Sequence, residues 1–384
     1  MTDRWFRHRT DISYAVGLAA GVAFFVGSGA LAEHDREIFT SDFSGIWSGA
    51  RGLLLGDNPY DAATWRTVAA SLGGQLPDTP VYGYPPWVAV ALVPLALLPL
   101  QAAAGLWLAA SVVVAAVALR ALLRVSLPGR SLEHGIIGAS LFMAQPGYRA
   151  LVNGQWTFVL VAATATVALL LATRPRLAAA VALLWLAKPQ LFVFAALGWG
   201  WGRPRFAATA MVLGLAIVGL GTLALPGWWP AWSAGVAPVR LDRPATVPSA
   251  LADLVGPAGR AVGLGLIGAA AVATARAFGS RGSAALAMWS ALSVAGALYI
   301  WSYDHLLLVV PLIIAAGAIR DVAPARARWL LIGGAAMLAV ISPMLYAIAL
   351  ARGRETYSAI LPTVFVIAIG ALCWPVRSNV RGAG

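Results

Sequence analysis

The polar residues that could take part in chemistry gather in one early stretch of an otherwise apolar chain. Between residues 33 and 80, seven Asp and Glu residues stand against three Arg residues, although the whole chain carries a net charge of +12. A carboxylate that is partly removed from water can act as a general base toward a hydroxyl group. We therefore look for the reactive group among these acids, and Asp42 leads them because it heads an expected helix.

Four further groups of polar residues stand inside or beside apolar runs. Lys188 is the single lysine of the chain and lies in the apolar run 177–201, in the sequence Lys188-Pro189-Gln190. A charged side chain at membrane depth is costly unless it faces protein or a cavity, so it marks a candidate functional site. The other groups are Tyr84, the pair Asn153 and Gln155, and the pair Asp304 and His305.

The elements that must position these residues are transmembrane helices. Apolar residues make up 60% of the chain and charged residues only 11%, whereas about 25% of the residues of a soluble domain are charged. The apolar residues form long runs, and about 20 of them cross the hydrocarbon core of a bilayer. We predict an all-α polytopic integral membrane protein with about 11–13 transmembrane helices, built as one domain over residues 1–384. The Arg clusters between the runs orient spans and do not indicate nucleic-acid binding.

The charge pattern also predicts how the chain crosses the membrane. Basic residues precede the first apolar run, so the N-terminus is expected in the cytoplasm and the loop 33–85 outside, with a retained first span. A second outer loop is expected at 227–260, where its tryptophans are interface anchors or a lid. Residues 86–119 leave two alternatives, because either one half is re-entrant or the Arg cluster at 120–130 lies outside. The single cysteine, Cys373, excludes a disulfide within the chain.

Local patterns predict short helices near the candidate residues. Apolar residues from Phe43 to Leu54 follow helical spacing, with Ser41 or Asp42 as the N-cap and Gly56 at the end. Asp61 is expected to cap a second helix, and both helices would lie on the membrane surface. The run 177–201 begins and ends at Arg clusters but is too short for two full spans. We therefore expect two half-length helices that meet at Lys188-Pro189.

The order of these motifs resembles that of glycosyltransferase family 87, over roughly residues 12–375. Each motif is short, and the shared order carries the resemblance. The motifs are Asp42 at the head of an amphipathic helix, Gly56-x-Asn58-Pro59-Tyr60, Tyr84-Pro85-Pro86, Asn153-Gly154-Gln155, Lys188-Pro189-Gln190, and Tyr303-Asp304-His305 ahead of Pro311.

The resemblance implies a GT-C fold and a specific kind of sugar transfer. An inverting enzyme would move a hexose, typically mannose, from a polyprenyl-phosphate donor to a lipid or glycan acceptor, on the outer face of the bacterial cytoplasmic membrane. Asp42 would be the general base. The leaving group is already anionic, so cationic groups should stabilise it, and we expect neither a metal nor a cofactor. The substrate-binding residues would be Lys188, His305, Asp304, Tyr84, Asn153, Gln155, Gln190, Asn58 and Tyr60.

Plainer roles remain open for several of these residues. Asp42 can cap its helix, Lys188 can reach interfacial water, and Asp304 with His305 can form a structural hydrogen bond. A transporter or lipid flippase for an envelope precursor is the alternative function, with Lys188, Asp304 and His305 along its path. A non-catalytic subunit of an envelope-assembly complex is a third reading. The asymmetric polar loop and the lack of an internal repeat favour the enzyme.

Overall fold

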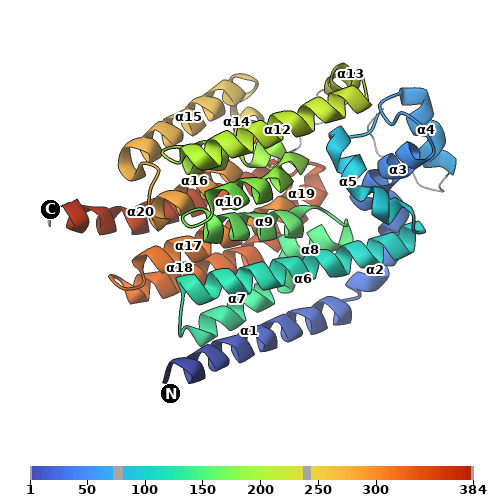
Figure 1. Cartoon of the computed structure of the whole chain (residues 1–384). Coiled ribbons are helices and arrows are strands. Elements are labelled where there is room, and N and C mark those ends of the chain that lie inside the picture. The colour runs from blue at the N-terminus through green and yellow to red at the C-terminus, as the bar shows by residue number, and fades with distance from the viewer. Residues whose placement is uncertain (1, 72–80, 237–243, 382–384) are drawn as a thin grey trace.

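The computed structural model describes residues 2–71, 81–236 and 244–381, and within these ranges the chain is helical without a β-strand (Figure 1). Seven described helices are long and apolar enough to cross a membrane. An eighth span arises when two helices joined by a 120° bend are counted together. The predicted all-α polytopic membrane protein is confirmed. The number of full-length spans is below the expected 11–13 because several apolar runs are divided into short helices.

The long elements form the body of the bundle. They are α1 (Thr2–Gly27), α6 (Leu100–Ser126), α12 (Pro204–Ala224), α15 (Ala258–Phe278), η4 with α17 (Ser302–Leu308 and Val309–Ile319), α18 with η5 and α19 (Pro324–Ala336, Met337–Ile341 and Ser342–Arg352), and η6 with α20 (Thr356–Ala359 and Ile360–Arg381). The bent pair consists of α8 (Gln145–Val152) and α9 (Thr157–Leu170).

Shorter helices connect the long ones or cover one end of the bundle. They are α2 (Ala30–Glu37), η1 (Ile38–Thr40), α3 (Asp42–Leu54), α4 (Ala62–Ser71), α5 (Pro86–Ala96), α7 (Ser131–Met143), α10 (Pro175–Ala182), η2 (Leu183–Ala187), η3 (Pro189–Leu191), α11 (Val193–Gly200), α13 (Trp228–Val236), α14 (Val247–Val255) and α16 (Ser283–Ala295). Helices α3, α4 and α5 gather at the end of the bundle away from the N-terminus (Figure 1).

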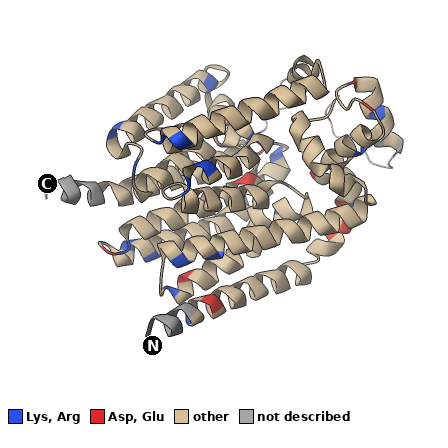
Figure 2. Cartoon of the chain, in the orientation of Figure 1, with Lys and Arg blue, Asp and Glu red and all other residues tan. Residues whose placement is uncertain are grey.

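The basic residues gather at the opposite end, on the left in Figure 2. Asp11 in α1 forms an ion pair of 2.9 Å with Arg120 and a second one with Arg124, both from α6. Arg203, at the start of α12, donates a hydrogen bond of 2.8 Å to the carbonyl oxygen of Ser280 after α15. Segments far apart in the sequence therefore place their Arg clusters together, and we call this the Arg-rich end.

The structure decides between the two alternatives for residues 86–119. Helix α5 has only 11 residues and packs on α3, and Pro99 sits at the N-cap of α6. Helix α6 then crosses the bundle once and brings Arg120 and Arg124 to Asp11. The short first half does not cross, and the Arg cluster lies at the same end as the N-terminus.

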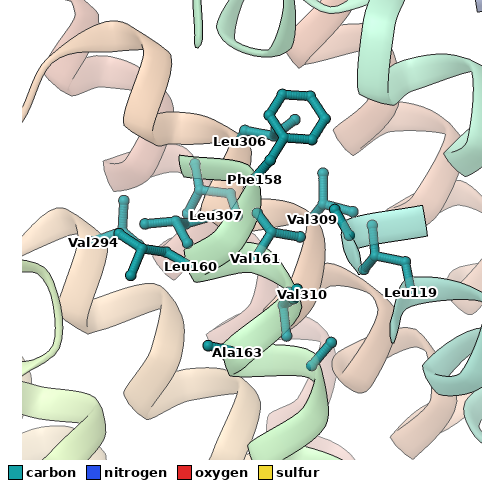
Figure 3. Packing of buried hydrophobic residues seen from close by; sticks show 14 of the residues in the cluster. Leu119, Phe158, Leu160, Val161, Ala163, Val294, Leu306, Leu307, Val309 and Val310 are labelled. Carbon is teal, nitrogen blue, oxygen red and sulfur yellow. The ribbon is translucent and has the colours of Figure 1, made fainter. Parts of the chain in front are cut away.

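The core of the bundle is formed by α9, α16 and the segment made of η4 and α17. Phe158, Val161 and Leu307 interdigitate there (Figure 3). The share of residues that are buried is 83% in the segment Ser302–Ile319, against 11% in α12 at the edge of the bundle. A charged residue at the start of this segment is therefore surrounded by protein, and Asp304 occupies that place.

The predicted break at Lys188-Pro189 is confirmed. Helix α10 tightens into η2, the chain turns at Lys188, and η3 leads into α11. Proline disfavours a helical conformation at the preceding residue, and Lys188 accordingly has φ −141° and ψ 69°. The rings of Trp185 and Phe192 stack across the turn at 4.7 Å between centroids and 4° between planes. The stacked rings hold the two arms of this hairpin together at the depth of the lysine.

Candidate active site

Ser41, and not Asp42, caps α3. The backbone N–H of Ser44 donates a hydrogen bond of 3.2 Å to Ser41 Oγ. Asp42 is the first residue of the helix, and its side chain is exposed. Gly56, with φ +83°, follows the end of the helix as predicted. A carboxylate at a helix N-terminus is stabilised by the unpaired backbone N–H groups, and here it is released from the capping role.

The turn between α8 and α9 docks directly on the start of α3. Gln155 Nε2 donates a hydrogen bond to Asp42 Oδ2, and the backbone N–H of Phe43 donates one of 3.1 Å to the carbonyl oxygen of Asn153. Gly154 has φ +62°, and a Cβ there would lie 2.5 Å from Phe43 Cβ. A side chain at residue 154 would therefore separate the two elements. The Asn153-Gly154-Gln155 motif works as a docking turn that brings an amide donor to Asp42.

Tyr84 lies beside the same carboxylate. Burial raises the pKa of its phenol well above the usual range, and the charge of Asp42 raises this pKa further, whereas a hydrogen bond with Gln155 lowers it. Tyr60 Oη donates a hydrogen bond of 2.5 Å to the carbonyl oxygen of Tyr84. Asn58 Oδ1 accepts one of 3.0 Å from the N–H of Tyr60. Asn58 and Tyr60 thus act on the loop backbone that positions Tyr84.

An aromatic cluster joins α13 to the loop that precedes α5. Trp228, from α13, lies 6.1 Å from Tyr60 and 5.5 Å from Trp87 between ring centroids. Trp232 Nε1 donates a hydrogen bond of 3.1 Å to the carbonyl oxygen of Gly83, next to Tyr84. Trp229 is 59% exposed, as expected of an interface anchor. Trp228 and Trp232 therefore pack against the loop that carries Tyr84, and Trp229 is exposed at the surface.

A buried ion pair forms the second half of the site. Lys188 Nζ lies 2.9 Å from Asp304 Oδ1 and 3.1 Å from Oδ2. Thr157 Oγ1 donates a further hydrogen bond of 2.8 Å to Asp304 Oδ1. Lys188 is 7% exposed and Asp304 2% exposed, so the lysine does not reach interfacial water. Each charge has a partner, as burial requires.

Tyr303 connects the two halves. Its ring lies under Lys188 Nζ at 4.7 Å from the ring centroid, a distance typical of a cation–π contact. Tyr303 also interacts electrostatically with Asp42, Asp304 and Tyr84. The structure therefore brings Asp42, Gln155 and Tyr84 into one neighbourhood with Lys188 and Asp304, through a tyrosine to which the sequence analysis assigned no role.

Two expected site residues have no hydrogen bond to this constellation. His305 is fully buried, and neither ring nitrogen has a hydrogen-bond partner among the described residues. The alternative of a structural bond between His305 and Asp304 is thus wrong, because Asp304 is engaged by Lys188 and Thr157. Gln190 lies half-buried in η3, just after the turn at Lys188-Pro189.

Sequence reasoning also missed a late carboxylate. Glu355, between α19 and η6, accepts a hydrogen bond of 2.6 Å from the backbone N–H of Ser302. Burial raises the pKa of Glu355, hydrogen bonds from Ser302 lower it, and the nearby charge of Asp304 raises it. The sequence could have indicated this residue, because Glu355 is the single acid between the apolar runs 329–350 and 357–375.

Asp61 has the structural role that the sequence predicts. Its Oδ1 accepts a hydrogen bond of 2.8 Å from the N–H of Thr64 at the start of α4, and this bond lowers the pKa of the carboxyl. Across the part of the chain that the structure describes, no group of three or more His, Cys, Asp and Glu side chains could hold a metal ion. Metal-independent chemistry stays a prediction.

Comparison with known families gives one match. The model of glycosyltransferase family 87 matches residues 82–311, which is more than half of the chain. The matched range includes Tyr84, Gln155, Lys188 and Asp304, whereas Asp42 lies ahead of it. It is narrower than the range 12–375 suggested by the motifs. Curated proteins and solved structures gave no significant match.

Proposed function

The chain belongs to glycosyltransferase family 87, and from this premise we propose that it transfers a hexose, most readily mannose, from a polyprenyl-phosphate donor to a lipid or glycan acceptor. The protein is a glycosyltransferase with a multi-pass helical membrane domain. Its donor is expected to be a lipid-linked sugar, because the candidate site lies at the end of a membrane-embedded bundle, where such a donor can reach it from the bilayer.

The single observation that carries the proposal is the position of Asp42. This carboxylate is freed from capping by Ser41 and held by Gln155, and it interacts electrostatically with Tyr303, whose ring also lies against Lys188. In the proposed step, Asp42 takes the proton of the acceptor hydroxyl as its oxygen bonds to the anomeric carbon. The bond from that carbon to the phosphate oxygen breaks on the opposite face, which inverts the configuration. The electron pair leaves with the phosphate.

Lys188 is the proposed source of positive charge for that leaving group. Charge on the phosphate increases as the bond breaks, and a fixed cation in a water-poor site stabilises it. Asp304 keeps the ammonium buried and oriented before the donor arrives, with Thr157 fixing the carboxylate in turn. Tyr84 and Gln155 would then contact the sugar or the acceptor beside Asp42.

The Arg-rich end indicates the orientation in this proposal. Arg clusters are retained on the cytoplasmic side of a membrane. The end with α3, α4 and α5 lies opposite (Figures 1 and 2). Asp42 would then face outward from a bacterial cytoplasmic membrane, where acceptors of the cell envelope are found.

A transfer assay tests the proposed function. Purified protein should move labelled mannose from polyprenyl-phosphate mannose to an acceptor in a lipid extract, and it should do so faster than from polyprenyl-phosphate glucose. A product labelled only from a nucleotide sugar would contradict the choice of donor. Uptake of labelled solute into vesicles without a covalent product would favour the transporter instead.

Gln155→Leu should change the pH profile of transfer. Removing the N–H donor to Asp42 favours the protonated acid over the carboxylate, because a hydrogen bond to the charged form stabilises that form. The acidic limb of kcat/KM should therefore move to higher pH, by on the order of one unit for a charged hydrogen bond. A purely structural role would lower the rate without moving the limb, and an unmoved limb would contradict the assignment of Gln155 as a positioning residue.

A further inference from the structure

An apolar groove lies on the surface of the bundle, away from the candidate active site. It has a volume of about 320 Å³ and is formed by α17, α18 and α20. Its walls are almost entirely apolar, and its single charged residue is Arg326. Leu312, Trp329, Gly333, Gly334 and Met337 line it beside that residue, together with apolar side chains of α20.

The groove follows one face of α18 and its continuation. Arg326, Trp329, Gly333 and Met337 recur at intervals of three and four residues, which places them along one side of a helix. From Arg326 to Met337 the helix rises roughly 16 Å at 1.5 Å per residue. This length is about half of the ~30 Å hydrocarbon core. The groove thus matches the depth of one membrane leaflet.

Two glycines shape the groove in different ways. A Cβ on Gly334 would lie 2.7 Å from a methyl carbon of Leu312, so this glycine lets α18 approach α17 closely. A Cβ on Gly333 would meet nothing within 4 Å, so this residue leaves the groove open. The π-helical turn η5 begins at Met337, at the inner end of the groove. Such turns often occur at functional sites.

The outer end of the groove carries positive charge. Arg326 is exposed, and within the described ranges its guanidinium has no ion pair or hydrogen bond. It follows shortly after Arg320, which donates a hydrogen bond of 3.1 Å to the carbonyl oxygen of Val125 at the Arg-rich end. Trp329 is 71% exposed, as is usual for tryptophan at a membrane interface.

We propose that this groove binds an anionic phospholipid from the leaflet at the Arg-rich end, with one acyl chain along Gly333 and the phosphate at Arg326. The apolar walls match a hydrocarbon chain, the length matches one leaflet, and the unpaired guanidinium matches a phosphate. The site is independent of sugar transfer, since its residues lie on α17, α18 and α20 and not around Asp42.

Native mass spectrometry of the full-length protein in detergent tests the site, with phosphatidylglycerol and phosphatidylcholine added in parallel. Wild type should retain one phosphatidylglycerol about fivefold more tightly than phosphatidylcholine, as expected for roughly one basic residue near an anionic head group. Gly333→Leu should lose that lipid by filling the groove, and Arg326→Gln should keep a lipid but lose the preference. Glycerol phosphate should not compete, because the acyl chain supplies most of the contact.

Matched controls make the result decisive. Gly265 on α15 also has nothing within 4 Å of a Cβ, so Gly265→Leu adds the same side chain outside the groove. Arg328→Gln removes an exposed charge two residues from Arg326. Both controls should bind like wild type. Equal binding of the two lipids to wild type, or loss of lipid in Gly265→Leu as much as in Gly333→Leu, would overturn the proposal.

Discussion

Asp42→Asn is expected to reduce kcat for sugar transfer by roughly 10²–10⁴-fold, the usual contribution of a general base. The substitution keeps the shape of the side chain, and Gln155 Nε2 can still donate to the remaining carbonyl oxygen. Ser41 still caps α3, so the helix should remain intact. The fold should therefore survive while the proton acceptor is lost. Transfer rates measured under saturating donor and acceptor give the test.

Two comparisons separate catalysis from binding and from folding. Asp57→Asn removes another acid of the same connection and should leave the rate within a factor of about two, since surface substitutions have small effects. Thermal unfolding of Asp42→Asn in detergent should match wild type. A variant that retained near-normal kcat would refute Asp42 as the base, and a raised KM with unchanged kcat would make it a binding residue instead.

Single substitutions in the Lys188–Asp304 pair should have the largest effect on stability. Lys188→Met leaves the Asp304 carboxylate buried with Thr157 as a neutral partner, and Asp304→Asn leaves a buried ammonium without its counter-charge. Breaking a buried pair costs about 3–5 kcal/mol, because the remaining charge is uncompensated. Both variants should show a clearly lower thermal midpoint or fail to accumulate in the membrane.

The double variant distinguishes a structural pair from a catalytic one. With Lys188→Met and Asp304→Asn together, no charge is left unpaired, so much of the lost stability should return. Sugar transfer should stay at least about 10²-fold below wild type, because the cation proposed to stabilise the phosphate is absent. A stable double variant with normal transfer would show that the pair only holds the fold. A double variant no more stable than either single one would contradict the coupling of the two charges.

Local chemistry made part of this protein predictable. Asp61 caps α4 as expected, and the chain breaks at Lys188-Pro189, where a proline follows a charged residue inside a short apolar run. Both features depend on neighbours in the sequence. The sequence left Ser41 and Asp42 as alternative caps. In the structure Ser41 caps α3, and Asp42 instead accepts a hydrogen bond from Gln155 in a turn that is distant in the sequence.

The contacts that assemble the site were not predictable in the same way. Lys188 and Asp304 are separated by 116 positions, and their pairing joins the turn after η2 to η4, two segments whose contact nothing in the local sequence indicates. Tyr303 was visible within its motif, but its contact with Lys188 depends on the same packing. The division of the apolar runs into long and short helices was also not predictable, because runs such as 86–119 contain a short helix beside a long one.

The hairpin made of α10 and α11 has a consequence for how the chain is threaded into a membrane. Arg203, just after α11, donates a hydrogen bond to the carbonyl oxygen of Ser280 at the Arg-rich end. Arg174, just before α10, belongs to another Arg cluster of the kind that faces the cytoplasm. We therefore expect the hairpin to contribute an even number of passages. A hydropathy profile that scored it as a single pass would invert the sidedness of every segment after Arg203. Reporter fusions placed before Arg174 and after Arg203 should therefore report the same compartment.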